Sequence, residues 1–266
     1  MTIRTVLATR YVTPLREGGS LPALVEADDD GIYVVKFRGA GQGPKALIAE
    51  LVAGEVMRAL GLPAPEIVFV HVDPLLARSE PDGEVQALVQ ASAGLNLALD
   101  YLPGSFDYSP LLTPTPDPAL ASAVVWADAY LTNVDRTPRN PNLLLWHRRL
   151  WLIDHGAALY FHHFTAGFSP YVARARSPFP QVRDHVLLPV AADLEDADRR
   201  LAPLLTPRIV EDIVALVPDE WLGDEDDGAW TGPVERRAAY TAYLLNRLAP
   251  PRPFVEEAIR ARAALD

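Results

Sequence analysis

The stretch that decides the fold runs from Asn133 to Gly156. It begins with a polar loop, Asn133–Asn142 (NVDRTPRNPN), which is followed by a short apolar run, Leu143–Trp146 (LLLW). A basic turn of His-Arg-Arg leads into a second apolar run that ends in the sequence Ile-Asp-His-Gly. Two short apolar runs joined by a tight polar turn predict a β-hairpin, with an Asp at the end of its second strand.

Such a hairpin brings three polar groups toward one point, from the loop before it and from the strand end after it. Asp135, in the loop, is suited to accept a proton from a hydroxyl nucleophile. An Asn of the same loop and Asp154 supply the oxygen ligands that Mg²⁺ prefers between phosphate groups. The segment therefore predicts phosphoryl-transfer chemistry.

This order of residues resembles the catalytic core of the protein-kinase-like superfamily, in which a loop Asp precedes an Asn, two strands and an Asp-x-Gly sequence. Here Asp154-His155-Gly156 stands for Asp-x-Gly, with His in the middle. The resemblance is closest to the HipA-like kinases and more distant to phosphatidylinositol kinases, which also begin this loop with Asp-Arg. It implies that Asp135 is catalytic, that ATP and Mg²⁺ are bound, and that Asp154 is a metal ligand.

The Asn that would bind the metal is not decided by the sequence. Asn140 has the spacing of protein kinases, five residues after Asp135, whereas Asn142 directly precedes the hydrophobic strand. We favour Asn142, because its junction with Leu143 fixes its position more firmly than a count along a loop with two prolines. Both remain candidates.

The N-terminal part supplies the elements that the resemblance requires for nucleotide binding. Residues 32–37 (IYVVKF) form a predicted strand that carries Lys36, the expected phosphate anchor. The predicted helix 44–60 places Glu50 at the edge of its apolar face, as the partner of Lys36, and Glu55 on the solvated side. A buried lysine needs such a partner.

A glycine-rich loop is expected at Gly18-Gly19-Ser20, between the first two strands, although no GxGxxG sequence is present. Further strands are predicted at 6–14, 21–26, 67–72 and 85–90. The composition changes after residue 92, where loops rich in glycine and proline precede a predicted helix at 118–131. Helices are also predicted within 187–205 and at 207–216, 234–248 and 254–265.

These elements predict an α+β, two-lobed, protein-kinase-like fold. Residues 1–92 would form an N-lobe with a small antiparallel sheet and one helix, and residues 93–266 a mainly helical C-lobe with the catalytic hairpin. ATP would lie between the lobes. Residues 157–185 would form an activation or substrate-binding segment.

Composition excludes several other classes of protein. The chain has no cysteine, which excludes thiol nucleophiles, disulfides and zinc–thiolate sites. Its net charge of −11 disfavours nucleic acid as a partner. No run is apolar enough for a membrane span or a signal peptide, so a cytoplasmic protein is expected, and the richness in Ala, Arg and Pro suggests a bacterial source.

The predicted activity is transfer of the γ-phosphoryl group of ATP, and the resemblance to HipA-like kinases implies a Ser or Thr hydroxyl of a protein as the acceptor. A lipid or small-molecule kinase, and a pseudokinase that binds nucleotide without turnover, are the alternatives. His155, His162 and His163 raise a weaker hypothesis of a transition-metal site. The absence of GxSxG argues against a serine hydrolase.

Overall fold

The computed structural model describes residues 2–15, 21–78, 80–111, 115–164, 167–223 and 230–265. The expected glycine-rich loop residues Gly18, Gly19 and Ser20 lie outside the described residues.

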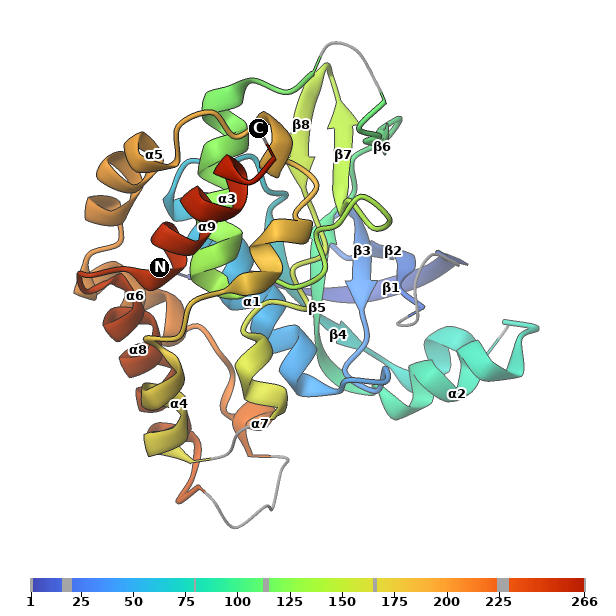
Figure 1. Cartoon of the computed structure of the whole chain (residues 1–266). Coiled ribbons are helices and arrows are strands. Elements are labelled where there is room, and N and C mark those ends of the chain that lie inside the picture. The colour runs from blue at the N-terminus through green and yellow to red at the C-terminus, as the bar shows by residue number, and fades with distance from the viewer. Residues whose placement is uncertain are drawn as a thin grey trace.

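The N-terminal part is a small barrel closed in the strand order β1-β2-β3-β5-β4 (Figure 1). Its strands are β1 (Thr5–Pro14), β2 (Ala23–Ala27), β3 (Ile32–Lys36), β4 (Ile67–Val72) and β5 (Gly94–Asp100). Neighbouring strands are antiparallel except β1 and β4, which pair in parallel through residues 5–7 and 69–71. The prediction of an antiparallel sheet is thus corrected to a closed sheet with one parallel pair.

Successive side chains of each strand point alternately into and out of the barrel, and the inward-pointing apolar side chains fill its interior. Val25, Tyr33, Val35 and Val70 are fully buried, or nearly so, in one cluster inside it. Their neighbours along each strand point outward. Lys36 is the last residue of β3 and follows the buried Val35, so its side chain lies on the outer face.

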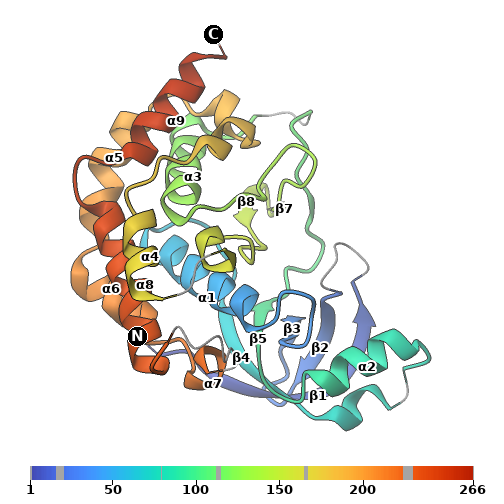
Figure 2. The ribbon, with the colours of Figure 1, turned by 60° about the horizontal axis from the view of Figure 1, so that its bottom comes forward.

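Helix α1 (Pro44–Ala59) lies between the barrel and the C-terminal helices in both views (Figures 1 and 2). It begins with Pro44 at a first-turn position, where a missing N–H costs nothing. Gly61, at φ 72°, ends it in the left-handed conformation that glycine adopts without strain. The predicted helix is confirmed, and its buried residues belong to a large apolar cluster shared with the C-terminal helices.

The predicted strand at 85–90 is wrong. Residues Gly83–Ala91 form helix α2, capped by the Asp82 side chain, which accepts a hydrogen bond from the Glu84 N–H at 3.0 Å. The strand that completes the barrel is β5, which pairs with both β3 and β4. The sheet therefore continues to Asp100, past the expected lobe boundary at residue 92.

The C-terminal part is mainly helical and carries the hairpin β7 (Leu143–Trp146) and β8 (Arg149–Leu152), with β6 (Phe106–Asp107) paired to β7. The long buried helix α3 (Pro118–Leu131) precedes it, as predicted. The other helices are α4 (Phe168–Arg174), α5 (Leu194–Leu201), α6 (Pro207–Val214), α7 (Asp219–Leu222), α8 (Pro233–Leu248) and α9 (Pro253–Ala263). Helices α5, α6, α8 and α9 lie on the side of the molecule away from the barrel (Figure 2).

Among the residues that the structure describes, none of the helices has the length and apolar character needed to cross a membrane.

Candidate functional site

Lys36, Glu50 and Asp154 meet, although they come from β3, α1 and the end of the hairpin. Lys36 Nζ donates to Glu50 Oε2 at 2.6 Å and also to Asp154 Oδ1. The Lys36 side chain is 13% exposed, so it is not an edge-strand lysine with its ammonium in water. Burial alone would lower the pKa of Lys36, but the charges of Glu50 and Asp154 outweigh this and raise it. The lysine is therefore a fixed cation.

Glu50 is the buried partner of this cation. Its side chain is fully buried, and His155 Nδ1 lies 3.3 Å from its Oε1. Burial would raise the pKa of Glu50, yet the Lys36 charge and the His155 contact bring it down to about 2. Glu55 was expected on the solvated side; instead its side chain is only 12% exposed, burial raises its pKa, and Arg58 Nε lies 3.2 Å from its Oε1.

The open end of the hairpin holds Asn142 and Asp154 opposite each other. Asn142 precedes β7 and Asp154 follows β8, both with positive φ, at 50° and 53°. The Ile153 N–H donates to Asn142 O at 3.1 Å, and Asn142 Nδ2 lies 3.4 Å from Asp154 O. Left-handed backbone at two non-glycine residues costs free energy, and such strain is typical of functional sites.

Asp135 lies beside both candidate asparagines. Its Oδ2 accepts from Asn140 Nδ2 at 2.7 Å and from Asn142 Nδ2 at 3.4 Å. Burial raises the pKa of Asp135, the hydrogen bond from Asn142 opposes this, and the charge of Asp154 adds to it. Asn140 is exposed and contacts Asp135, whereas Asn142 is partly buried and contacts both Asp135 and the Asp154 backbone.

A buried polar cluster below the loop holds Asp135 in place. Asp128, in α3, is fully buried and accepts from Asn133 Nδ2 at 2.9 Å and from Arg136 Nε at 2.6 Å. His185 Nε2 lies 3.0 Å from Asp128 Oδ2, and since its Nδ1 accepts from the Leu187 N–H, the proton is on Nε2. Burial lowers the pKa of His185, which keeps the ring neutral.

Arg136 joins this cluster to the hairpin. Its Nη1 donates to Asn142 O and, at 3.3 Å, to Ile153 O, so one side chain ties both ends of the hairpin to α3. Sequence reasoning missed the roles of Asp128, Arg136 and His185. One signal was present, because Asp128 is the only ionisable side chain in the run from Ala119 to Ala129, whose other residues are apolar except for Ser122.

The transition-metal hypothesis for the histidines is not supported. Within the described ranges, no group of three or more His, Cys, Asp or Glu side chains is placed to hold a metal ion. His155 contacts Glu50, while His162 Nδ1 lies 2.9 Å from the Tyr240 hydroxyl and its Nε2 lies 3.1 Å from His163 Nε2.

Comparison with solved structures shows that the fold is kinase-like. The crystal structure of the Helicobacter pylori proinflammatory kinase CtkA aligns with a TM-score of 0.59 and 12% identity, over 99% of each chain. The Golgi casein kinase with Mn/ADP bound aligns with a TM-score of 0.47 and 12% identity, over 95% of this chain and 74% of that one. Comparison with curated proteins gives no match.

The family follows from a second comparison. The model of the family described as HipA-like kinase matches residues 9–251, which is most of the chain and includes the site. The chain belongs to the HipA-like kinase family.

Proposed function

We propose that the protein is an ATP-dependent phosphotransferase that acts on a hydroxyl group, with Ser or Thr of a protein as the acceptor. One observation supports the proposal most strongly: Lys36 is hydrogen-bonded to both Glu50 and Asp154, and Asp135 lies close enough to Asp154 to feel its charge. Phosphoryl transfer depends mainly on positioning and on charge stabilisation, and these side chains provide both.

Asp135 is proposed as the proton acceptor. Its Oδ2 is engaged by two side-chain amides, which orient the carboxylate. Its Oδ1 has no hydrogen-bond donor among the described residues and remains open to an acceptor hydroxyl. As the bond from the γ-phosphorus to the hydroxyl oxygen forms and the bond to the ADP oxygen breaks, the hydroxyl proton passes to Asp135.

Asp154 and Asn142 are the proposed Mg²⁺ ligands, and they fit this role by their donor chemistry. The Asp154 side chain is 45% exposed, and the amide nitrogen of Asn142 faces Asp135 and Asp154 O, which leaves its Oδ1 as a ligand. Bound Mg²⁺ would neutralise phosphate charge. Lys36 would bind the phosphates, held in place by Glu50.

The test is transfer of label from γ-³²P-ATP by purified wild type and variants, in the presence of Mg²⁺. Dephosphorylated casein, phosphatidylinositol vesicles and the protein itself are offered as acceptors. We expect label on protein, and a loss of at least about a hundredfold in Asp135→Asn and Asp154→Asn. The control Asp107→Asn removes an exposed carboxylate of β6 and should leave transfer unchanged.

Two results would contradict the proposal. Binding of ATP without transfer to any acceptor would identify a pseudokinase. Label on lipid alone would show that the acceptor is a membrane lipid and would reject the protein acceptor.

A further inference from the structure

A cavity of about 330 Å³ lies in the helical part of the molecule, and most of its lining residues belong to the expected activation or substrate-binding segment, residues 157–185. It is bounded by the residues after the hairpin, by the end of α4 with the residues that follow it, and by the last turns of α8. Thr132, which ends α3 just before the catalytic loop, also lines it. The volume lies within the range of small-molecule sites, about 300–1,000 Å³.

One wall of this cavity carries a buried cation without a carboxylate. Arg247 is 1% exposed, and its guanidinium donates to backbone carbonyls only: Tyr130 O at 2.8 Å, Ala175 O at 3.1 Å, Ser177 O at 2.8 Å and Ala129 O at 2.8 Å. Two of these carbonyls lie at the C-terminal end of α3, and the Phe254 ring centroid lies 4.9 Å from the guanidinium carbon, so dipoles and a ring face stabilise the cation, but none of these described partners carries a full negative charge. Among the described residues, one Nη2 hydrogen has no acceptor.

A second cation lines the same cavity. Arg174, at the end of α4, is exposed, and it forms no ion pair with any residue in the described part of the chain. No Asp or Glu is among the described residues that line the cavity. In a protein with a net charge of −11, two arginines without a carboxylate make this a local positive site.

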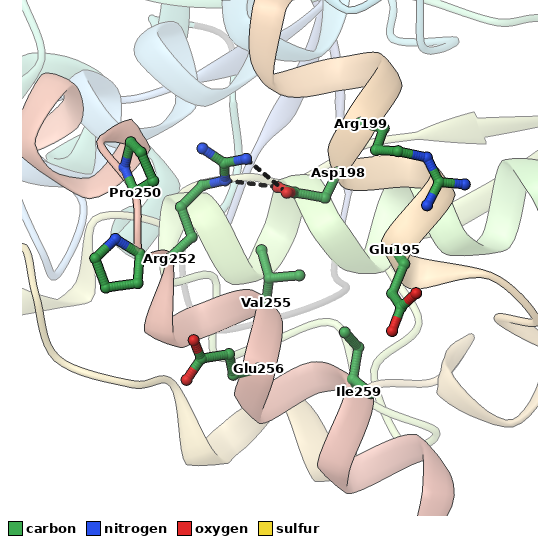
Figure 3. Close-up of a pocket in the computed structure, with 9 residues that line it drawn as sticks. Glu195, Asp198, Arg199, Pro250, Arg252, Val255, Glu256 and Ile259 are labelled. Carbon is green, nitrogen blue, oxygen red and sulfur yellow. Dashed lines mark hydrogen bonds and ion pairs between the residues drawn. The ribbon is translucent and has the colours of Figure 1, made fainter.

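A second cavity shows the opposite arrangement (Figure 3). It has about 340 Å³, and both of its arginines have carboxylate partners: Arg252 donates to the two oxygens of Asp198 at 2.7 and 2.6 Å, and Arg199 donates to Asp196 at 3.2 Å. Glu195 and Glu256 line it as well. A buried arginine that has no carboxylate partner among the described residues therefore distinguishes the cavity at Arg247 from this one.

The remaining walls are aromatic. Phe161 stacks on Tyr243 with ring centroids 3.7 Å apart, and Phe164 packs edge-on against Tyr160 at 4.8 Å. Phe164 is 66% exposed, so a flat apolar face is open at this cavity. Such rings stack on planar ligands.

We propose that this cavity binds a small planar organic anion, with the anionic group between Arg174 and Arg247 and the ring against Phe164 and Tyr160. The site is separate from the Lys36 site and its occupancy does not require phosphoryl transfer. Because Arg247 also holds the last carbonyls of α3, the ligand contacts a group that supports the start of the catalytic loop.

The proposal is tested by calorimetric titration of the full chain with phenyl phosphate, with phenol as the uncharged control. We expect saturable binding of phenyl phosphate and affinity for phenol that is lower by at least about tenfold, because charge-assisted hydrogen bonds are lost. Arg174→Gln should lower phenyl phosphate affinity by about tenfold, and Phe164→Ala should lower it severalfold. Both side chains are exposed, so neither change should prevent folding.

Two matched variants locate the binding. Arg183→Gln removes another exposed arginine, with a side chain 74% exposed, and should leave the affinity unchanged. Lys36→Met removes the cation of the catalytic site and should also leave it unchanged. The proposal is overturned if phenyl phosphate does not bind at millimolar concentration, if phenol binds equally well, or if Lys36→Met abolishes binding while Arg174→Gln does not.

Discussion

Asn142 and Asn140 both hydrogen-bond to Asp135, yet their surroundings give them different roles. Asn142 lies between the two carboxylate residues and has a positive φ, whereas Asn140 is exposed, and its side chain hydrogen-bonds only to Asp135 among the described residues. A metal ligand must be fixed in space, and this condition favours Asn142.

We predict that Asn142→Ala raises the Mg²⁺ concentration for half-maximal activity by at least about tenfold, because a ligand is lost. Asn140→Ala should lower kcat, since it removes a 2.7 Å hydrogen bond to Asp135, but should leave the Mg²⁺ dependence unchanged. The measurement is initial rate against Mg²⁺ at saturating ATP. The reverse pattern would assign the ligand to Asn140.

The pH dependence should report the environment of Asp135. Because burial and the charge of Asp154 raise its pKa above the usual 3.8, the carboxylate takes up a proton at a higher pH than an ordinary Asp. We therefore predict that kcat/KM falls with decreasing pH through this raised pKa.

The variant Asp154→Asn tests whether the charge of Asp154 contributes to the raised pKa of Asp135. Removing that charge should move the pKa of Asp135 downward, which can be followed in the inactive variant by NMR titration of the Asp135 carboxyl carbon. An unchanged or higher pKa in Asp154→Asn would contradict the electrostatic explanation.

At the scale of elements, α3, the polar loop Asn133–Asn142 and the hairpin are joined by one buried charged cluster. Arg136 donates to Asp128 on α3 and to the carbonyls at both ends of the hairpin. Removing one partner of a buried ion pair leaves the other charge uncompensated.

We predict that Arg136→Met lowers the free energy of unfolding by about 3–5 kcal/mol, because Asp128 remains buried with only Asn133 and His185 as partners. The control is Arg139, an exposed arginine of the same loop. Arg139→Met should change the free energy of unfolding by no more than about 0.5 kcal/mol. Urea denaturation followed by circular dichroism measures both. Equal effects in the two variants would show that the cluster does not support the loop.

Elements with strong local signals were predictable, and those defined by packing were not. The hairpin, α1 and α3 have clear periodicity and end signals. Helix α2 was predicted as a strand because its short run contains Val85 and Val89, although their spacing also fits one buried helix face. Strand β5 (GLNLALD) contains no β-branched or aromatic residue, and its pairing with β3 and β4 overrides its weak propensity.

The same distinction between local sequence signals and tertiary packing applies to the residues of the candidate site. The candidate residues Lys36, Glu50, Asp135 and Asp154 could be predicted from their chemistry and order along the chain, and the structure brings them together, while their roles stay a prediction. The supporting cluster could not, since Asp128 and His185 are 57 residues apart and only the tertiary structure shows that they meet.

At the scale of the whole molecule, the chain has two apolar cores, one inside the barrel and a larger one that includes α1 and the C-terminal helices. Helix α1 therefore belongs to the same apolar core as the C-terminal helices. Ile67 of β4 and Leu97 of β5, on the outer face of the barrel, are also part of this larger core. Glu50 is fixed to the larger core, and Lys36 is carried by the barrel.

We predict from this division that amide hydrogen exchange of α1 follows the C-terminal helices. Leu244→Ala removes a buried side chain of the larger core. It should lower the free energy of unfolding of the protein by about 2–5 kcal/mol and accelerate amide exchange in both α1 and α8. Val25→Ala, in the barrel core, should accelerate exchange in β1–β5 and leave α1 unchanged. Mass spectrometry of peptic fragments measures both. Faster exchange of α1 in Val25→Ala alone would place the helix with the barrel instead.

The ion pair between Lys36 and Asp154 means that a side chain of the protein itself acts as the counter-ion of Asp154. Without a bound divalent ion, the ammonium of the barrel neutralises the very carboxylate that is proposed to hold the metal. If Asp154 holds Mg²⁺ as proposed, it would have to release the Lys36 ammonium when the metal binds. A polyphosphate bound together with the metal would give that ammonium a new partner, whereas a metal ion alone would not.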